Sequence, residues 1–379
     1  MKKAALAIAV LLTATPALAQ LPGGLGKLTK AKETADKVQG LKISEEDERK
    51  IGEQVSEKVR DTFGVYQDAA VTKYVTLVGT VLAQASSRPN LKWEFIVLDT
   101  DGVNAFAAPG GIVHITKGLL GLIKDESELA GALGHEITHI TAKHTVNSIQ
   151  KSNAFSAAAS ASGQGGGLTQ DILTRIVEAA YTNILNNNFD RNDENEADKI
   201  GIELANKIGY APSGLASVLT KIAERNSDRQ EPNGLFASHP QIKDRIAKIN
   251  GTIQSEKLTA TATVAARYTK TITFDATPAA SIATVAEGSR GLAGSSGSEG
   301  EKDKKDGEKP EKKEEKKGGL FGSKLGLSSG KDTKNTQTVA SAGARGINPD
   351  RDATGGSNKN KVPVTLTAAE ITAFKSGIA

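Results

Sequence analysis

His135-Glu136-Ile137-Thr138-His139 is the stretch of this 379-residue chain around which its fold can be read. Positions four apart in an α-helix lie one turn apart on the same face, so both imidazoles can reach one metal ion. Glu136 is turned about 100° from His135 and can face a water held by that metal. Apolar residues flank the motif and predict a buried helix, where two unpaired histidines and a glutamate would be costly. The alternative is a helix whose histidines are only hydrogen-bonded.

The elements around this motif are mainly helical. Asp125 and Glu128 have the spacing of an N-terminal capping box, which predicts a helix running from there to about Gln150. Apolar periodicity predicts two helices upstream of it, over 43–62 and 67–86.

Two extended stretches separate these helices from the motif. Residues 93–98 alternate between apolar and polar and predict a strand, and residues 103–115 predict a second stretch with a Pro109-Gly110-Gly111 turn inside it. A Gly- and Ser-rich loop is expected over 160–168. Downstream, we predict helices over 169–186, 191–208, 212–225 and 240–250, and a β-prone stretch over 258–275.

A catalytic zinc needs a third protein ligand and an open position. Acidic residues gather between Asp193 and Asp198, where Glu194 and Asp198 are four apart. One carboxylate can bind the metal while the other accepts a hydrogen bond from a ligand imidazole. The alternative is a solvated helix start stabilised by acidic side chains.

Four motifs resemble, in their order along the chain, the HtpX, BepA and CAAX-prenyl-protease group of zinc peptidases. They are HEITH with His144 after it, Glu194-Asn195-Glu196-Ala197-Asp198, Asn104-Ala105-Phe106-Ala107-Ala108-Pro109-Gly110-Gly111 followed by Gly118-Leu119-Leu120, and Ser238-His239-Pro240 with Arg245. The resemblance covers about residues 43–250 and implies an α+β, mainly α, zincin-like metallopeptidase domain. One departure is Asn188-Phe189-Asp190-Arg191, where relatives tend to carry Tyr-Ser-Arg before the glutamate.

The resemblance implies a role for particular residues. His135, His139 and Glu194 would hold one Zn²⁺, Asp198 would support a ligand histidine, and Glu136 would be the general base. His239 and Arg245 would lie over the cleft as donors to the oxyanion. For His239 two other roles stay open, as a plug on the zinc or as a cap of the following helix. The strand at the edge of the small sheet, with Asn104, Ala105, Phe106 and Ala107, would line the cleft and pair with an extended substrate.

The two other histidines that precede the acidic motif have plainer interpretations. His114 is expected to be a surface or edge residue of a strand. His144 is turned about 100° off the ligand face and is expected to pack or to support a ligand rather than bind metal.

Residues 1–19 have the pattern of a signal peptide. Lys2 and Lys3 precede an apolar stretch, and Ala17-Leu18-Ala19 is a small-x-small cleavage site. The alternative is a retained anchor, for which the apolar run is short. The chain has no cysteine, so any zinc site must use histidine and carboxylate ligands. We therefore expect a periplasmic or secreted protein cleaved near Ala19.

The remaining length divides by composition. We expect a flexible arm over 20–42, the zinc metallopeptidase domain over 43–252 and a β-prone extension over 253–287. Residues 288–360 are expected to be a disordered linker, since 299–319 contain eight acidic residues, eight lysines and almost nothing apolar. Residues 361–379 regain apolar periodicity and are expected to form a short strand and helix.

These features predict a zinc endopeptidase of the cell envelope that cleaves unfolded or misassembled proteins. The first alternative is an envelope chaperone or assembly factor with a structural or latent zinc site, and the second is a peptidoglycan-associated protein with a vestigial site. A net charge of +4 without a basic stripe argues against nucleic acid as a partner. No later apolar run predicts a transmembrane segment after signal removal, and peripheral association with a membrane stays open.

Overall fold

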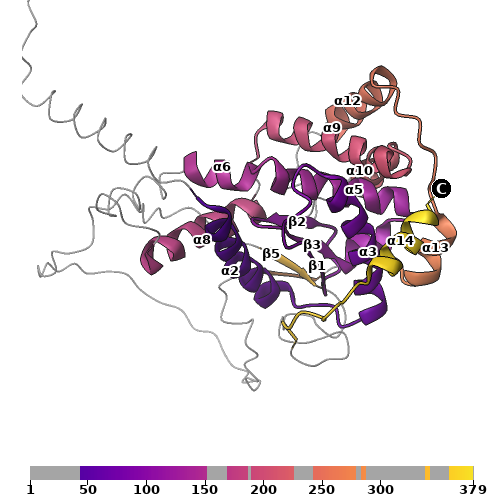
Figure 1. Cartoon of the computed structure of the whole chain (residues 1–379). Coiled ribbons are helices and arrows are strands. Elements are labelled where there is room, and N and C mark those ends of the chain that lie inside the picture. The colour runs from indigo at the N-terminus through magenta and orange to yellow at the C-terminus, as the bar shows by residue number, and fades with distance from the viewer. Residues whose placement is uncertain are drawn as a thin grey trace, which may run out of the picture.

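The computed structural model describes residues 43–151, 169–186, 189–225, 242–278, 283–286, 338–341 and 358–378. The predicted signal peptide, arm and 160–168 loop lie outside these residues, as do His239 and most of the predicted linker. Helices surround a small sheet, and residues near both ends of the described chain lie against this body (Figure 1). The prediction of an α+β, mainly helical fold is confirmed.

The sheet has three strands, β1 (Glu94–Leu98), β2 (Ala105–Ala108) and β3 (Ile112–Thr116), in the order β1-β3-β2. β1 runs parallel to β3, and β2 runs antiparallel to it. Gly110 and Gly111 have φ values of 72° and 98° in the turn between β2 and β3, a conformation that favours glycine. Among the described strands, the order makes β2 an edge strand, as expected, and puts β3 in the middle.

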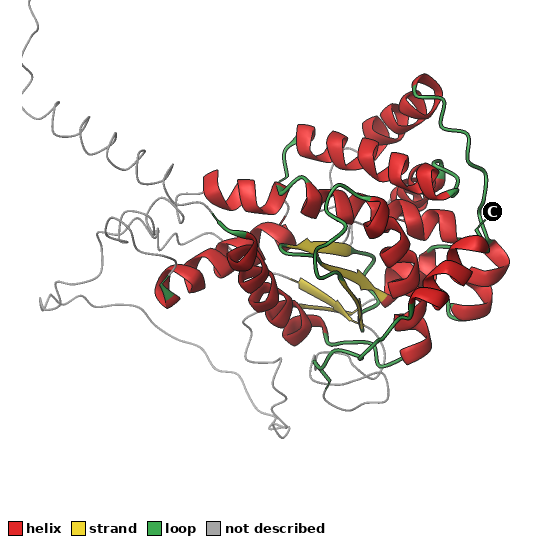
Figure 2. Ribbon diagram, in the orientation of Figure 1, coloured by secondary structure: helices red, strands yellow, loops and turns green. Residues whose placement is uncertain are grey.

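Helices cover both faces of the sheet, so successive side chains of a strand enter different layers of core (Figure 2). Phe95 and Val97 face one layer, whereas Ile96 and Leu98 face the other. This burial on both faces explains the nearly continuous apolar character of the strands. The helices of the first layer are α3 (Ala69–Ala85), α5 (Glu126–Thr141) and α10 (Gly214–Arg225), and those of the second are α2 (Glu45–Phe63) and α8 (Gln170–Asn186).

The other described elements lie around these layers. None of the described helices is long and apolar enough to cross a membrane. The remaining elements are α4 (Lys117–Leu122), α6 (His144–Lys151), α9 (Arg191–Ile208), α12 (Ile242–Ser255), α13 (Ala265–Thr271), α14 (Ala368–Ser376), and an antiparallel pair, β4 (Ala283–Ala286) and β5 (Thr338–Ser341).

The turn between β2 and β3 is held by α2. A Cβ on Gly52 would lie 1.8 Å from the Pro109 carbonyl oxygen, so only glycine allows this approach. Glu48, which is buried, accepts a hydrogen bond from the Gly110 amide at 3.2 Å. The guanidinium of Arg49 donates to the Gly110 carbonyl at 3.1 Å. The helix thus fixes where the edge strand β2 ends.

The helix predicted to run to about Gln150 is two helices, so that prediction is wrong at its end. α5 stops at Thr141, and Lys143 has φ 60°, in the left-handed region. The Lys143 amide bonds to the Ile140 carbonyl at 3.1 Å, which turns the chain before α6. This conformation usually marks a helix end with a glycine, and lysine rarely adopts it. Because a lysine stands here, the sequence gives no signal of the break.

The β-prone stretch over 258–275 is also wrong for most of its length. Residues 265–271 form α13, and the described strand character nearby is an isolated bridge between Tyr210 and Ala262 and, further on, β4. Tyr268 is buried and donates to the Leu120 carbonyl at 2.6 Å. Long-range burial of one aromatic side chain has overridden the local β preference of this stretch.

His114 is not at the surface or at an edge. It lies in the central strand β3, fully buried, with its Nε2 atom 2.9 Å from Ser56 Oγ. Burial lowers the pKa of His114 to about 3, with the positive charge of Arg60 acting in the same direction. The imidazole is therefore a neutral core residue near neutral pH.

Candidate metal centre

Two imidazoles converge on the face of α5 that meets α9. The Nε2 atoms of His135 and His139 lie 3.0 Å apart, one helical turn from each other. Nearly the whole of α5 is buried, and both histidines are at most 3% exposed. The lone pairs of two unprotonated ring nitrogens this close repel each other, and burial excludes the water that could separate them. A cation bound by both nitrogens would remove this repulsion.

Glu194 supplies a carboxylate to the same point from α9. Its oxygens lie 3.7 Å from His135 Nε2 and 3.5 Å from His139 Nε2. The three donor atoms all lie within 4.8 Å of one another, and all three residues are buried. Ligand bonds of about 2.0–2.1 Å in a tetrahedron put neighbouring donors about 3.3 Å apart, close to the distances observed. The donor set of two nitrogens and one oxygen fits zinc.

The start of α9 fixes the position of Glu194. Asp190 caps the helix, and its carboxylate accepts from the amides of Asn192 and Asp193 at 2.8 and 3.0 Å. The helix ends at Ile208, and its C-cap Gly209 has φ 112°. With both ends set by capping, Glu194 falls in the first helical turn, on the side that faces α5.

Two glycines let α5 and α9 come close enough for this. A Cβ on Gly134 would lie 2.8 Å from the Gly201 carbonyl oxygen, and one on Gly201 would lie 2.8 Å from the His135 amide nitrogen. Both neighbours are main-chain atoms of a helix and cannot move aside cheaply. Sequence analysis missed this pair, although glycine inside a helix is itself a signal of a close approach.

Asp198, one turn after Glu194, holds His135 from behind. Its carboxylate is 2.9 Å from His135 Nδ1 and pairs with Arg245 Nη2 at 2.6 Å and Nε at 2.8 Å. Burial opposes ionisation of Asp198, but the Arg245 guanidinium and the hydrogen bond from His135 keep its pKa below the ordinary range. A carboxylate at Nδ1 leaves Nε2 of the imidazole as the metal-binding atom.

Arg245 connects both carboxylates of α9. Besides Asp198 it contacts Glu194 Oε2, at 3.1 Å from Nη1, and it is 3% exposed. Burial works against its charge, yet Asp198 and Glu194 raise the pKa of the guanidinium further. The side chain therefore links the candidate ligand Glu194 to Asp198, and its role at the oxyanion stays a prediction.

His139 has two ring neighbours of its own. Its Nδ1 lies 2.9 Å from Nδ1 of His144, whose Nε2 is 3.4 Å from Glu196 Oε2. The ring of Phe189 stacks on His139 with centroids 4.1 Å apart. His144 thus contacts a candidate ligand through its outer nitrogen, and Phe189 covers the ring of that ligand.

The other predicted site residues take these positions. Glu136 follows His135 on α5 and is 2% exposed. Ala105, Phe106 and Ala107 lie in β2, the strand that packs against α5, and Asn104 directly precedes it. All four are buried. His239 lies outside the described residues, so its role stays a prediction.

A buried His-His-Glu set on two crossing helices beside a small mixed sheet is the arrangement of a metallopeptidase domain. Residues 69–253 match Peptidase family M48, so the chain contains a domain of that family. The family resemblance drawn from the motifs is confirmed.

Several curated proteins are similar to the same part of the chain. The Beta-barrel assembly-enhancing protease of Escherichia coli K12 is 25% identical over 55% of this chain and 44% of its own length. Metalloprotease YcaL of the same organism is 32% identical over 42% of this chain and 61% of its own length. The Mitochondrial metalloendopeptidase OMA1 of Schizosaccharomyces pombe is 30% identical over 47% and 52%. The chain thus covers less than half of the assembly-enhancing protease.

Proposed function

We propose that this protein is a zinc-dependent endopeptidase of the cell envelope that cleaves unfolded or extended protein segments. The observation that carries the proposal is the convergence of His135, His139 and Glu194, with Glu136 beside them on α5. A zinc ion bound there would polarise a peptide carbonyl and lower the pKa of water. The M48 domain and relatives named as metalloproteases support this activity.

Glu136 is the proposed general base. Its carboxylate takes a proton from the attacking water and passes it to the leaving nitrogen of the cleaved peptide bond. Arg245 is proposed as a positioning residue, because its guanidinium holds both Asp198 and Glu194. Of the two residues expected to donate to the oxyanion, His239 is the one proposed here as the donor.

The proposed substrate is an extended polypeptide. β2 is an edge strand of the sheet and packs beside the helix of the metal centre. A peptide added to such an edge is held by main-chain hydrogen bonds, which require an extended shape but little sequence. Asn104 to Ala107 are the proposed pairing residues. Export through the predicted signal peptide would direct the enzyme to envelope proteins.

The second candidate function is an assembly factor with a structural or latent zinc site. The name of the assembly-enhancing relative favours it. The two candidates differ at Glu136, because a structural zinc site needs no general base.

Glu136→Gln tests the proposal. We expect the variant to keep its zinc and its fold but to lose at least 10²-fold in cleavage of casein, since an amide cannot accept the proton. Zinc content and the melting temperature are measured on the same sample, and chelator-treated wild type is the control. Cleavage at the wild-type rate by the variant would refute the assignment, and a zinc-loaded wild type without any cleavage would favour the assembly factor.

A further inference from the structure

Residues 358–378, called here the docking segment, lie beyond the M48 match and return to the helical body that contains it. Their first part is held by main-chain contacts. The Asn358 carbonyl accepts from the Val65 amide at 2.9 Å, and the Asn360 carbonyl accepts from the side-chain amide of Gln67 at 3.0 Å. Arg60 Nη1 donates to the Lys359 carbonyl at 2.7 Å. This end of the segment is therefore bound through its backbone, as extended peptides are.

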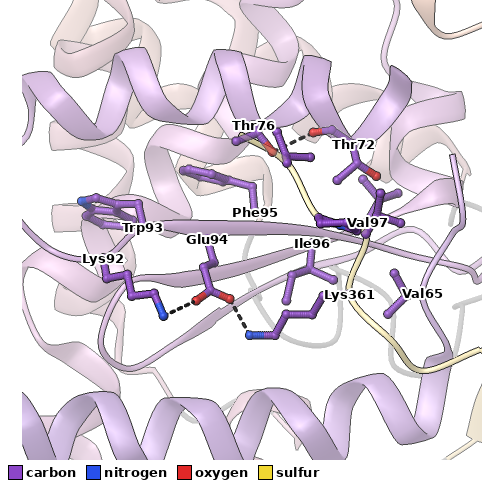
Figure 3. A pocket seen from close by; sticks show the side chains of 13 residues that line it. Val65, Thr72, Thr76, Lys92, Trp93, Glu94, Phe95, Ile96, Val97 and Lys361 are labelled. Carbon is purple, nitrogen blue, oxygen red and sulfur yellow. Dashed lines mark hydrogen bonds and ion pairs between the residues drawn. The ribbon is translucent and has the colours of Figure 1, made fainter. Parts of the chain in front are cut away.

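The middle of the docking segment crosses β1, at the sheet edge opposite β2. Lys361 pairs with Glu94, and residues 362–364 then pass the strand (Figure 3). Among the described residues no backbone hydrogen bond joins 362–364 to β1, and Pro363 has no N–H to offer. A cavity of about 470 Å³ remains between the strand and the segment. The segment covers this edge without becoming a fourth strand.

The last part is an apolar anchor on α3 and α13. Phe374 and Ile378 of the docking segment are 8% and 2% exposed. The ring of Phe374 meets Tyr74 edge-on with centroids 6.1 Å apart, and the Arg267 guanidinium lies 4.0 Å from its centroid. Arg267 also donates to the Phe374 carbonyl at 3.1 Å. A buried aromatic ring at one end and backbone contacts at the other are the features of a peptide bound in a groove.

Residues 279–357 connect the docking segment to the rest of the chain. Between residue 278 and residue 358 the structure describes the pair β4 and β5, and the intervening sequence at 299–319 is almost wholly charged residues, glycine and proline. Such a sequence acts as a tether that raises the local concentration of the segment. Its contacts, rather than this connection, would then hold the segment in place.

We propose that the docking segment is a bound peptide partner of the metallopeptidase domain, which stays in its groove after the chain is cut between residues 287 and 337. The inference is independent of the proposed catalytic activity. The cut turns an intramolecular contact into a bimolecular one without removing any contact. The cut protein is therefore a complex of two pieces whose stability depends on its concentration.

The experiment uses the full zinc-loaded protein with a recognition sequence for a site-specific protease in place of residues 302–308. After the cut, size-exclusion chromatography should show both pieces in one peak of monomer mass, separated only by denaturant. The melting temperature should fall when the cut protein is diluted, whereas that of the uncut protein should not. Two separate peaks at micromolar concentration would overturn the proposal, as would a dimer before the cut, which would place the segment in a second copy.

Phe374→Ala tests the groove itself. After the cut, we expect this variant to release the small piece at least tenfold more readily than wild type, because the apolar anchor is gone. The matched control is Lys375→Ala, one position along α14 and exposed, which should keep the piece. Should Phe374→Ala fail to fold, a labelled peptide of residues 358–379 provides the test. It should exchange into cut wild-type protein, and a peptide with Ala at 374 should not displace it; displacement by both peptides alike would contradict the proposal.

Discussion

The buried side chain of His114 makes the stability of this protein depend on pH in a predictable way. His114 has its pKa lowered to about 3, while a histidine in an unfolded chain titrates near 6.5. Below pH 6.5 the unfolded state binds a proton that the folded state does not, so the free energy of unfolding falls as pH falls toward 3. The loss is about 1.4 kcal/mol per pH unit, or about 2 kcal/mol at pH 5.

His114→Gln should remove this part of the pH dependence. Urea unfolding at pH 7 and pH 5 measures it, with the two proteins compared at the same zinc concentration. The zinc site is the same in both proteins, so its contribution cancels in the difference. An equal loss of stability in variant and wild type would show that His114 does not carry the effect.

His144 lies beside a candidate ligand, in agreement with the expectation that it packs against or supports one. Its Nδ1 lies 2.9 Å from His139 Nδ1. Neighbours of this kind orient a ligand ring, and their loss costs about 10–100-fold in metal affinity. We expect His144→Ala to weaken zinc binding by that factor, as measured by competition with a chromophoric chelator.

Asn147→Ala is the matched control for this variant, because Asn147 lies on the same helix and is exposed. It should leave the zinc affinity unchanged. A His144→Ala protein that binds zinc as tightly as wild type would reduce the contact with His139 to packing.

At the scale of elements, the metal centre depends on how closely α5 and α9 cross. Gly201→Ala puts a methyl group 2.8 Å from the His135 amide nitrogen, so α9 must shift and carry Glu194 and Asp198 with it. Forced packing of this kind costs about 1–3 kcal/mol of stability. We expect weaker zinc binding as well, which the same chelator competition would measure.

Gly251→Ala serves as the control for the change of residue type. Gly251 lies inside α12, and a Cβ there would meet nothing within 4 Å. Alanine is the better helix former by about 1 kcal/mol, so this variant should be slightly stabilised and keep its zinc. Unaltered stability and zinc affinity in Gly201→Ala would show that the helices can relax around the added methyl group.

At the scale of the whole molecule, most of the long charged segment should be dispensable for folding. Ala286 and Thr338 are paired at the end of the antiparallel β4 and β5. Replacing residues 287–337 by Asn-Gly would therefore close a two-residue hairpin between them. We expect the melting temperature and casein cleavage to stay near wild type, because the removed sequence contains little that could build a core.

This deletion is smaller than the predicted linker of 288–360, because the structure assigns contacts to part of that range. β5 pairs with β4, and Lys359 and Asn360 bond to Arg60 and Gln67. A deletion that also removes 358–360 should lower the melting temperature. A large fall with the Asn-Gly replacement alone would instead assign a structural role to 287–337.

The sequence by itself determined the features that depend only on residues a few positions apart. His135, Glu136 and His139 are placed by the 3.6-residue period of one helix, and the start of that helix by the Asp125 cap, whose carboxylate accepts from the Glu128 amide at 3.0 Å. The turn between β2 and β3 follows likewise from its proline and two glycines. Such features need no knowledge of the rest of the chain.

Only the tertiary structure decided what depends on contacts between distant residues. Arg245 on α12 pairs with Asp198 and Glu194 on α9. Residues 265–271 became a helix because Tyr268 and Arg267 meet α4 and α5. His114 was buried by helices on both faces of its strand. In each case the free energy of desolvation and pairing exceeds local preference, and a local pattern contains no record of the partner.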